Sequence, residues 1–361
     1  MKMIKINSLQ FGTIIFFFIF ASLIGIGVSN TTFYASRDAV ISVILSYAIG
    51  FIPIIIFLYL FKQDKNIIEL INYTFGKRLG LVINIILVIP IIVISGVVIS
   101  AISNFLVSQF LTDTPIYVIY LCMFVVIIYA VYSGIEAISR TAIVLSSLIT
   151  LYFIISVLGI SSNIRIDNFL PLFEHGIVPD IKASIFFVLT DIIPIFIMLC
   201  ISKKNIRDKE NVNKSIIVSY SIGMFVSLAS MIMTIGSLGI YLTNIYEYPE
   251  YIMLKKISFF NFLNRIENLI SIHWLFLSLL IVTMSVYYVN RLIKVKKKEN
   301  SIVVSFLTLI VIYAFCIVTF KNNTMLVSFT KYIYPYVNLG YFVILLIISV
   351  IYFFKRRKVK V

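Results

Sequence analysis

Residues 184–201 read SIFFVLTDIIPIFIMLCI, an apolar run long enough to cross a lipid bilayer as a helix. A carboxylate, Asp191, lies inside this run shortly before Pro194. A charged side chain at mid-bilayer costs about 2.5–3.5 kcal/mol on insertion scales, so such residues usually face a cavity or a partner group. Proline removes a backbone donor and interrupts a helix. The run therefore predicts a membrane helix interrupted near Asp191, which either takes part in function or, protonated or as a cap, only stabilises the interruption.

The rest of the chain has the composition of a membrane protein. Of its 361 residues, 61% are hydrophobic and 12% are charged, whereas soluble domains average about 45–50% apolar and about 25% charged residues. Water-soluble classes are therefore excluded, and we predict an all-α integral membrane protein with a single transmembrane domain over residues 1–361. Ten runs are long enough to span a bilayer: 10–29, 40–61, 82–110, 116–133, 141–160, 184–201, 215–240, 269–290, 301–320 and 335–354.

The distribution of lysine and arginine predicts the orientation of these ten runs. The chain has 30 Lys+Arg, 15 Asp+Glu and a net charge of +15. With the N-terminus in the cytoplasm, 22 of the 30 cations fall in cytoplasmic segments, as the positive-inside rule requires. We therefore expect both termini to be cytoplasmic. The positive charge is explained by topology in a lipid bilayer, and no nucleic-acid partner is expected.

Ten spans divide into two halves of five, residues 10–160 and 184–354, and an odd number inverts the second half relative to the first. This is the arrangement of transporters with a LeuT/APC-like inverted repeat, in which the first helix of each half is broken near the midplane. The first run contains Gly25 and Gly27, and glycine weakens a helix. The alternative is that these glycines only allow close helix packing. We predict breaks in the first and the sixth helix.

Two broken helices would form a ligand site near the midplane. Freed N–H groups at half-helix N-termini bind a carboxylate, and freed carbonyls suit an ammonium group, so the pair complements a zwitterionic amino acid. Asp191 would add a counter-charge for the ammonium group or a proton-binding site. The predicted ligand-binding residues flank the two breaks: Gly25, Ile26, Gly27, Thr190, Asp191, Ile193 and Pro194.

Motifs of enzyme chemistry are missing from the sequence. It contains no Ser/His/Asp set, no HExxH, no phosphate-binding GxxxxGK[ST], and its three cysteines are too far apart for a metal site. We therefore expect no enzyme activity, no metal and no cofactor. Three further charged residues, Asp38, Arg265 and Glu267, are candidates for a structural or gating role.

Several short stretches resemble the spore-permease family, which contains the B subunits of endospore germinant receptors and belongs to the amino acid–polyamine–organocation superfamily. The similarity extends over essentially the whole chain in order and spacing. The stretches are Gln10 leading into Gly25-Ile26-Gly27, Arg37-Asp38-Ala39-Val40-Ile41-Ser42, Gly76-Lys77-Arg78-Leu79-Gly80, Tyr248-Pro249, Lys256-Ile257 and Phe262-Leu263-Asn264-Arg265-Ile266-Glu267.

The resemblance implies a transporter-like fold in the inner membrane of a dormant spore, where the family senses germinants beside an A subunit and a lipoprotein C subunit. It also implies a small nutrient ligand such as an amino acid. Three hypotheses remain open: a receptor subunit, an amino-acid:proton symporter that uses Asp191 for coupling, and a membrane scaffold. The scaffold hypothesis leaves the breaks and the buried acid unexplained.

Overall fold

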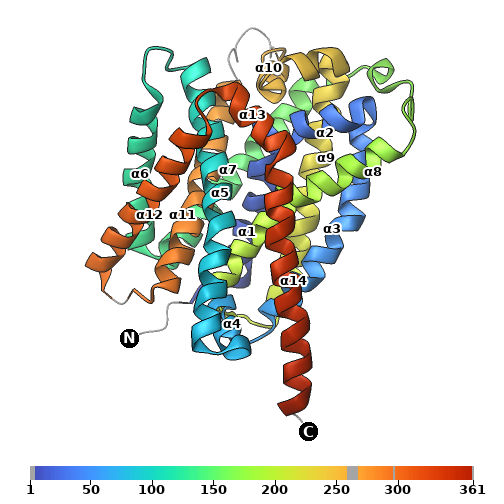
Figure 1. The fold of residues 1–361 in the computed structure, drawn as a ribbon. Helices are drawn as coiled ribbons and strands as arrows, with labels where there is room; N and C mark the ends of the chain where they lie inside the picture. Colours follow the sequence, from blue (N-terminus) through green and yellow to red (C-terminus); the bar gives the residue numbers. More distant parts are fainter. Residues whose placement is uncertain (1–4, 258–266, 296, 360–361) are drawn as a thin grey trace.

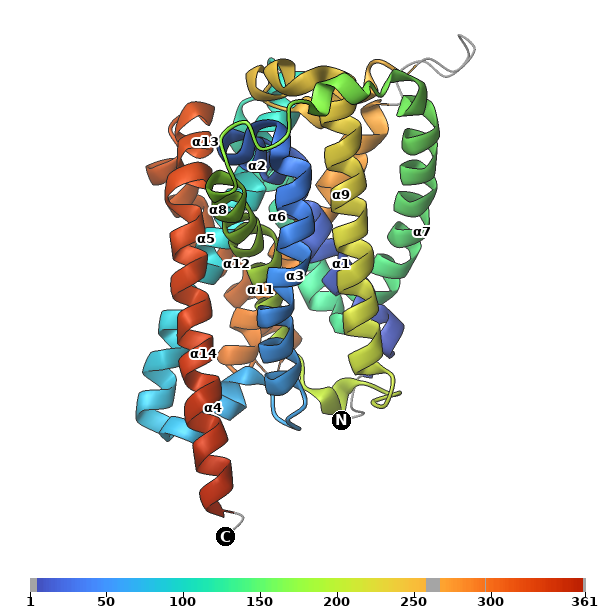
Figure 2. The ribbon, with the colours of Figure 1, turned by 90° about the vertical axis from the view of Figure 1, so that its right-hand side faces the viewer.

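The computed structural model describes residues 5–257, 267–295 and 297–359. They form a helical bundle in which both ends of the chain lie at the same end (Figures 1 and 2). The elements in chain order are α1 (Ser8–Ser22), η1 (Leu23–Gly27), α2 (Val28–Ala35), η2 (Ser36–Asp38), α3 (Ala39–Phe61), α4 (Ile67–Phe75), α5 (Lys77–Gln109), α6 (Ile116–Ser133), α7 (Ile135–Ile160), η3 (Ser161–Asn163), η4 (Ile166–Phe169), α8 (Val178–Phe187), η5 (Val188–Ile192), η6 (Ile193–Cys200), η7 (Lys203–Asn205), α9 (Val212–Ile245), α10 (Pro249–Leu254), α11 (Glu267–Leu292), α12 (Lys298–Thr319), α13 (Asn323–Tyr332) and α14 (Tyr334–Val359).

Nine helical segments of the described part are long and apolar enough to cross a membrane, so the chain is a multi-pass membrane protein. One of the nine, Ser8–Phe61, is a segment of 54 residues that contains two of the ten predicted runs, 10–29 and 40–61. The five-plus-five inverted repeat stays a prediction.

The polar residues between these two runs remain helical because their hydroxyls bond back to the helix. Thr31 Oγ1 donates to the carbonyl of Gly27 (2.6 Å) and Thr32 Oγ1 to that of Val28 (3.0 Å). Each hydroxyl is thereby satisfied without leaving the helix. The chain reverses at Ser36, whose φ is +53°, and α3 then runs back toward the end that carries the termini (Figure 2).

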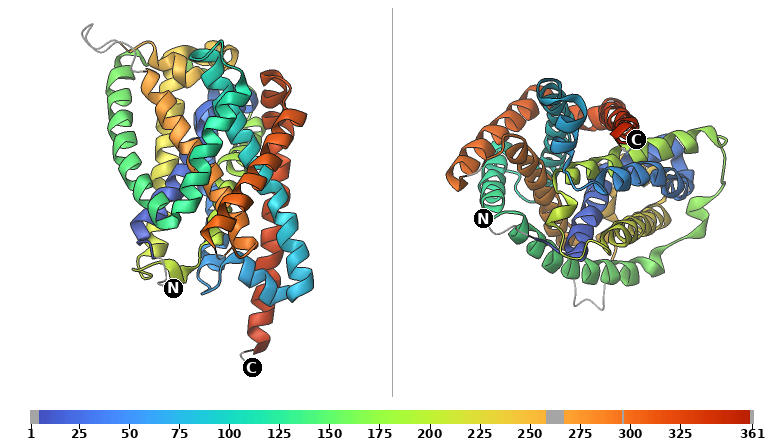
Figure 3. Two further views of the ribbon diagram at one scale, coloured as in Figure 1. Left: turned by 90° about the vertical axis from the view of Figure 1, so that its left-hand side faces the viewer. Right: turned by 90° about the horizontal axis from the view of Figure 1, so that it is seen from below.

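The segments differ strongly in how deeply they are buried. In Val178–Cys200, which contains α8, η5 and η6, 89% of the most apolar window is inside the protein, against 22% for Ile135–Asn163, which contains α7. The view along the bundle shows α1 near the centre, with α7 and α12 at the periphery (Figure 3). Residues 188–200, which form η5 and η6, are all buried. The two predicted breaks therefore lie on the buried helices.

Serine side chains allow α8 to pack closely against α3. The hydroxyl of Ser184 donates to the carbonyl of Ser42 (2.9 Å), and the hydroxyl of Ser46 donates to the carbonyl of Ser184 (3.1 Å). All three side chains are fully buried. Small residues of this kind bring membrane helices together and supply hydrogen bonds between them.

The beginning of α1 is tied to the segment that precedes α9. Ile6 N–H donates to the carbonyl of Asn205 (3.0 Å), and Arg207 N–H donates back to the carbonyl of Ile6 (2.9 Å). Ser8 N–H donates to Asp208 Oδ1 (2.7 Å), and the Ser8 hydroxyl donates to the other carboxylate oxygen. A carboxylate is favourable here because the N-terminus of a helix carries partial positive charge.

Replacing Asp208→Asn is expected to destabilise the protein by about 1–2 kcal/mol at neutral pH, because the start of α1 loses a charged acceptor. Burial alone would raise the pKa of Asp208, but the two hydrogen bonds from Ser8 hold it below the ordinary 3.8. A lowered carboxyl pKa stabilises the folded state above the unfolded pKa, and this contribution is lost as the pH falls through the folded pKa. Thermal unfolding in detergent should therefore separate the variant from the parent at neutral pH but not in strong acid. Glu210→Gln, an exposed carboxyl of the same segment, is the control, and identical melting temperatures at neutral pH would contradict the prediction.

Candidate functional site

Two buried segments depart from α-helical geometry. Leu23–Gly27 and Val188–Ile192 are each one π-helical turn, and the second continues as a 3₁₀-helix to Cys200. Single π-helical turns are rare and often occur at functional sites. These two turns, η1 and η5, contact each other. Both predicted break points therefore coincide with a change of helix type, and the fold brings them together.

Gly25 is held between two neighbouring elements. Its φ of +72° is in the region that favours glycine. A Cβ at this position would lie 2.3 Å from Cη2 of Trp274 in α11, a side chain that is 2% exposed. On another side, Gly25 N–H donates to Oε1 of Glu250 in α10 (3.3 Å). The position of the turn is therefore fixed by α11 and α10 together.

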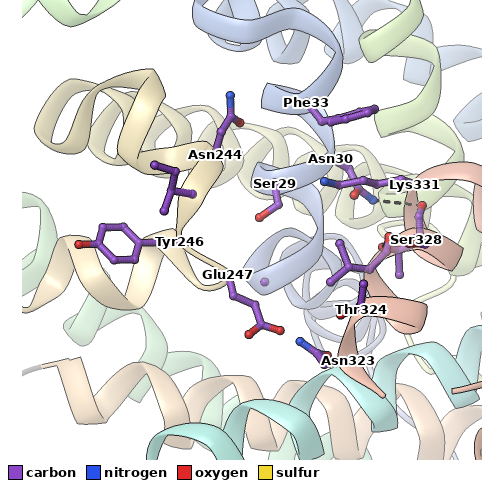
Figure 4. A pocket seen from close by; sticks show the side chains of 14 residues that line it. Ser29, Asn30, Phe33, Asn244, Tyr246, Glu247, Asn323, Thr324, Ser328 and Lys331 are labelled. Carbon is purple, nitrogen blue, oxygen red and sulfur yellow. Dashed lines mark hydrogen bonds between the residues drawn. The ribbon is translucent and has the colours of Figure 1, made fainter. Parts of the chain in front are cut away.

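A pocket of about 480 Å³ opens beside this turn, at the end of the bundle opposite the termini (Figures 1 and 4). Three segments form its wall: the turn with α2, residues 244–247 at the end of α9 and just beyond it, and α13. The lining is largely polar apart from Phe33, Ile245, Tyr246 and Val327. Its polar side chains are Ser29, Asn30, Asn244, Glu247, Asn323, Thr324, Ser328, Thr330 and Lys331.

The pocket contains one carboxylate and one ammonium group. Glu247 reaches in from the segment after α9 and Lys331 from α13, with Ser29 and Asn30 between them in Figure 4. Neither charge belongs to an ion pair within residues 5–257, 267–295 and 297–359. Burial raises the pKa of Glu247 and lowers the pKa of Lys331 from their ordinary values. Two opposite charges therefore line one pocket without neutralising each other.

Hydrogen bonds connect α13 to α2 and position Lys331. Asn30 Nδ2 donates to the carbonyl of Thr330 (3.2 Å), and the Tyr34 hydroxyl donates to the carbonyl of Lys331 (2.9 Å). The Lys331 ammonium lies 4.4 Å from the ring centre of Phe33, a cation–π contact. A change in the turn at Gly25 would reach Lys331 through α2.

The predicted ligand-binding residues divide into two groups. Gly25 lines the pocket, and Ile26 and Gly27 lie beside it in the same turn. Thr190 and Asp191 are buried in η5, where the Thr190 hydroxyl donates to Asp191 Oδ2 (2.5 Å). Oδ1 of Asp191 has no hydrogen-bond partner in the part of the chain that the structure describes. Ile193 and Pro194 are buried at the start of η6. The second group does not line the pocket beside Gly25.

Two of the three further charged candidates, Asp38 and Glu267, do not line this pocket. Asp38 is 5% exposed, and its Oδ2 accepts a hydrogen bond from Phe173 N–H (2.9 Å), which attaches the loop before α8 to the start of α3. Glu267 is the first residue of α11 and is half-buried. Arg265 lies outside the described residues.

Glu247, Glu250 and Lys331 are not among the residues predicted from the sequence. They lie in short segments between the long apolar runs, where charged residues are ordinary. A signal was present for Lys331, one of only eight cations that the positive-inside count leaves on the outer side. Glu250 directly follows Tyr248-Pro249, one of the stretches that carries the family resemblance.

Comparison with known proteins supports the resemblance. A family model described as spore germination protein matches residues 5–324. The matched range includes Gly25, Asp191 and Glu250 and ends before Lys331. Spore germination protein KB of Bacillus subtilis (strain 168) is 25% identical over 242 residues, which cover 64% of this chain and 64% of that protein. The chain therefore matches slightly less than two thirds of the length of this relative.

Proposed function

Because this chain belongs to the spore germination protein family, we propose that it is the nutrient-sensing membrane subunit of a spore germinant receptor. The ligand is an amino acid or a similarly small zwitterion. The observation that carries this proposal is that the pocket beside the turn at Gly25 is lined by the Glu247 carboxylate and the Lys331 ammonium, neither of which is in an ion pair among the described residues. A zwitterion presents the complementary pair of charges.

The chemistry of the pocket suits this class of ligand. The Lys331 ammonium would bind the ligand carboxylate, and the Glu247 carboxylate would bind the ligand ammonium through charge-assisted hydrogen bonds. Amide and hydroxyl groups from Asn30, Asn323 and Ser328 line the same space. The volume of about 480 Å³ lies within the range of small-molecule sites in proteins, roughly 300–1,000 Å³.

The proposed orientation places the pocket on the outer side of the spore inner membrane. Lysine and arginine are concentrated at the end of the bundle that holds the termini, which is cytoplasmic by the positive-inside rule. A nutrient would enter from outside, and receptor subunits of the A and C types would be the partners. Binding would favour one arrangement of the turn at Gly25, by no more than the difference in affinity between the arrangements.

A symporter is the second candidate, and Asp191 is the observation that favours it. This carboxyl is fully buried between apolar segments, and one of its oxygens has no partner among the described residues. An intramembrane carboxyl of this kind is a common proton-coupling group in transporters. In this case η5 would form a further part of the transport path for the amino acid and the proton, and the pocket would be the start of that path.

Binding and uptake of radiolabelled L-amino acids by the full chain in liposomes test both candidates. A receptor subunit binds without accumulating the amino acid, whereas a symporter accumulates it under an imposed proton gradient and loses this uptake in Asp191→Asn. Absence of binding across all common amino acids contradicts both candidates. In parallel, spores that lack the gene and its paralogues should fail to germinate on the amino acid that binds, and normal germination contradicts the receptor role.

A further inference from the structure

Glu250 is a buried carboxyl immediately behind the pocket. Its side chain is 3% exposed, although α10 itself lies outside the membrane-spanning segments. Oε1 accepts the hydrogen bond from Gly25 N–H (3.3 Å). Oε2 has no hydrogen-bond partner in the described part of the chain. A buried carboxylate with one long hydrogen bond is poorly compensated, because burial of an ionised group is costly without partners.

A small cavity of about 30 Å³ adjoins Glu250. Tyr152 of α7 and His273 of α11 line it as well, and the Tyr152 hydroxyl also lacks a hydrogen-bond partner among the described residues. The two rings are stacked with centres 4.4 Å apart. The lining of this cavity is almost entirely apolar, so among the described residues it offers Glu250 few polar partners other than those side chains.

Among the described residues, no lysine or arginine lines the cavity beside Glu250. α10 packs against η1, α7, α9 and α11. From these elements the cavity receives two titratable side chains, Tyr152 and His273; from α9 it receives Ser230 and Met233, and η1 contributes the N–H of Gly25. His273 Nδ1 lies against the carbonyl of Leu269, which can only accept, so this nitrogen carries the proton. Burial raises the pKa of Glu250 to about 7.

We propose that Glu250 is a proton-binding site that controls the turn at Gly25. In the ionised state the carboxylate accepts the Gly25 N–H in a charge-assisted hydrogen bond, which holds the pocket wall in place. When a proton from bulk water binds at Oε2, the new O–H donates to the Tyr152 hydroxyl across the small cavity, and Gly25 N–H faces a neutral oxygen. Charge-assisted bonds are roughly twice as strong as neutral ones, so protonation loosens the turn.

The consequence for ligand binding rests on the proposed function, whereas the proton site itself does not. If only the ionised form holds the pocket, apparent affinity scales with the ionised fraction. Affinity one pH unit below the midpoint is then about tenfold weaker than one unit above it. The site thus makes nutrient sensing sensitive to pH near neutrality.

Infrared difference spectroscopy of the full chain in lipid nanodiscs tests the proton site without any ligand. All variants carry Asp191→Asn, which removes another fully buried candidate for proton binding. The carbonyl stretch of a protonated buried carboxyl is then expected to grow as the pH falls through about 7, and to be absent when Glu250→Gln is added. Glu247→Gln, the matched control in the pocket wall, keeps the band. Tyr152→Phe is the second variant, in which the protonated carboxyl loses its acceptor and the midpoint shifts downward.

A band that persists in Glu250→Gln, or a parent protein without a titrating band in this range, overturns the proposal. Binding of a mixture of the common L-amino acids is then measured across the same pH range. Absence of binding with an intact titrating band rejects the proposed function and leaves the proton site. Binding that is equally pH-dependent in the parent and in Glu250→Gln rejects the link between Glu250 and the pocket.

Discussion

Gly25→Ala is expected to weaken amino-acid binding roughly 30-fold or more, because two separate penalties fall on one turn. An alanine at φ +72° costs about 1–2 kcal/mol relative to glycine. Its Cβ would also lie 2.3 Å from Cη2 of Trp274, and overpacking of this kind costs about 1–3 kcal/mol. Trp274 has little room to move, since its ring centre lies 4.9 Å from that of Phe105. The turn must therefore shift, and with it the wall of the pocket.

Two variants separate the clash from backbone strain in this experiment. Gly134→Ala introduces a side chain at φ +87° with nothing within 4 Å, so it carries the strain without a clash. It should leave binding unchanged. Adding Trp274→Phe to Gly25→Ala removes the ring atoms that clash and should recover part of the affinity. Affinity is measured on the full chain in nanodiscs, after thermal unfolding has shown that each variant is folded. Parental affinity in Gly25→Ala would mean that this turn does not shape the pocket.

Lys331→Gln and Glu247→Gln are each expected to weaken amino-acid binding about 10- to 100-fold. Lys331→Gln removes the partner of the ligand carboxylate, and Glu247→Gln removes the partner of the ligand ammonium. A hydrogen bond to a charged group contributes about 1.5–3 kcal/mol, which corresponds to this range. A simple amine without a carboxylate should lose affinity only in Glu247→Gln. A carboxylic acid without an amino group should lose affinity only in Lys331→Gln. Competition of each analogue against a bound labelled amino acid provides the measurement.

Lys321→Gln is the matched control, because it removes an exposed lysine just before α13. It should leave the affinity of all three compounds unchanged. If both pocket variants weaken all three compounds equally, the charges act on the fold of the pocket and not on the ligand. That outcome would remove the main support for a zwitterionic ligand.

Much of the fold could be predicted from hydropathy and from two local signals. The apolar runs located the long helices, and Gly25 and Pro194 marked the places where helix type changes. The chain reverses at Ser36, within the polar stretch between the first two predicted runs. The helix continues past the end of the first run to Ala35, with the hydroxyls of Thr31 and Thr32 bonded back to it, and polarity alone does not predict that extension.

The candidate site could be predicted only in part, because its charges are distant in sequence. Glu247 and Lys331 meet Gly25 in one pocket through the arrangement of α9 and α13. Part of that arrangement comes from Gly239, whose φ of +74° kinks the end of α9. Asp191, the most conspicuous residue of the sequence, is buried away from the pocket. A carboxylate is rare in an apolar run, and this rarity predicted a site at η5. The charged side chains that line the pocket lie instead in segments between the long runs, where charged residues are common.

The attachment of α1 to the segment before α9 has a mechanical consequence. Ser8 is bonded to Asp208 at one end of α1, and its carbonyl accepts from the Ser215 hydroxyl of α9 (2.7 Å). Because these bonds hold the N-terminal end of α1 in place, α1 cannot slide along its axis when its other end is displaced. A shift at Gly25 is therefore directed away from the clamp, into α2 and α13 at the opposite end of the bundle. A ligand that moves this turn would therefore change the protein surface at the end of the bundle that holds α2 and α13. The end that holds the termini would keep its packing.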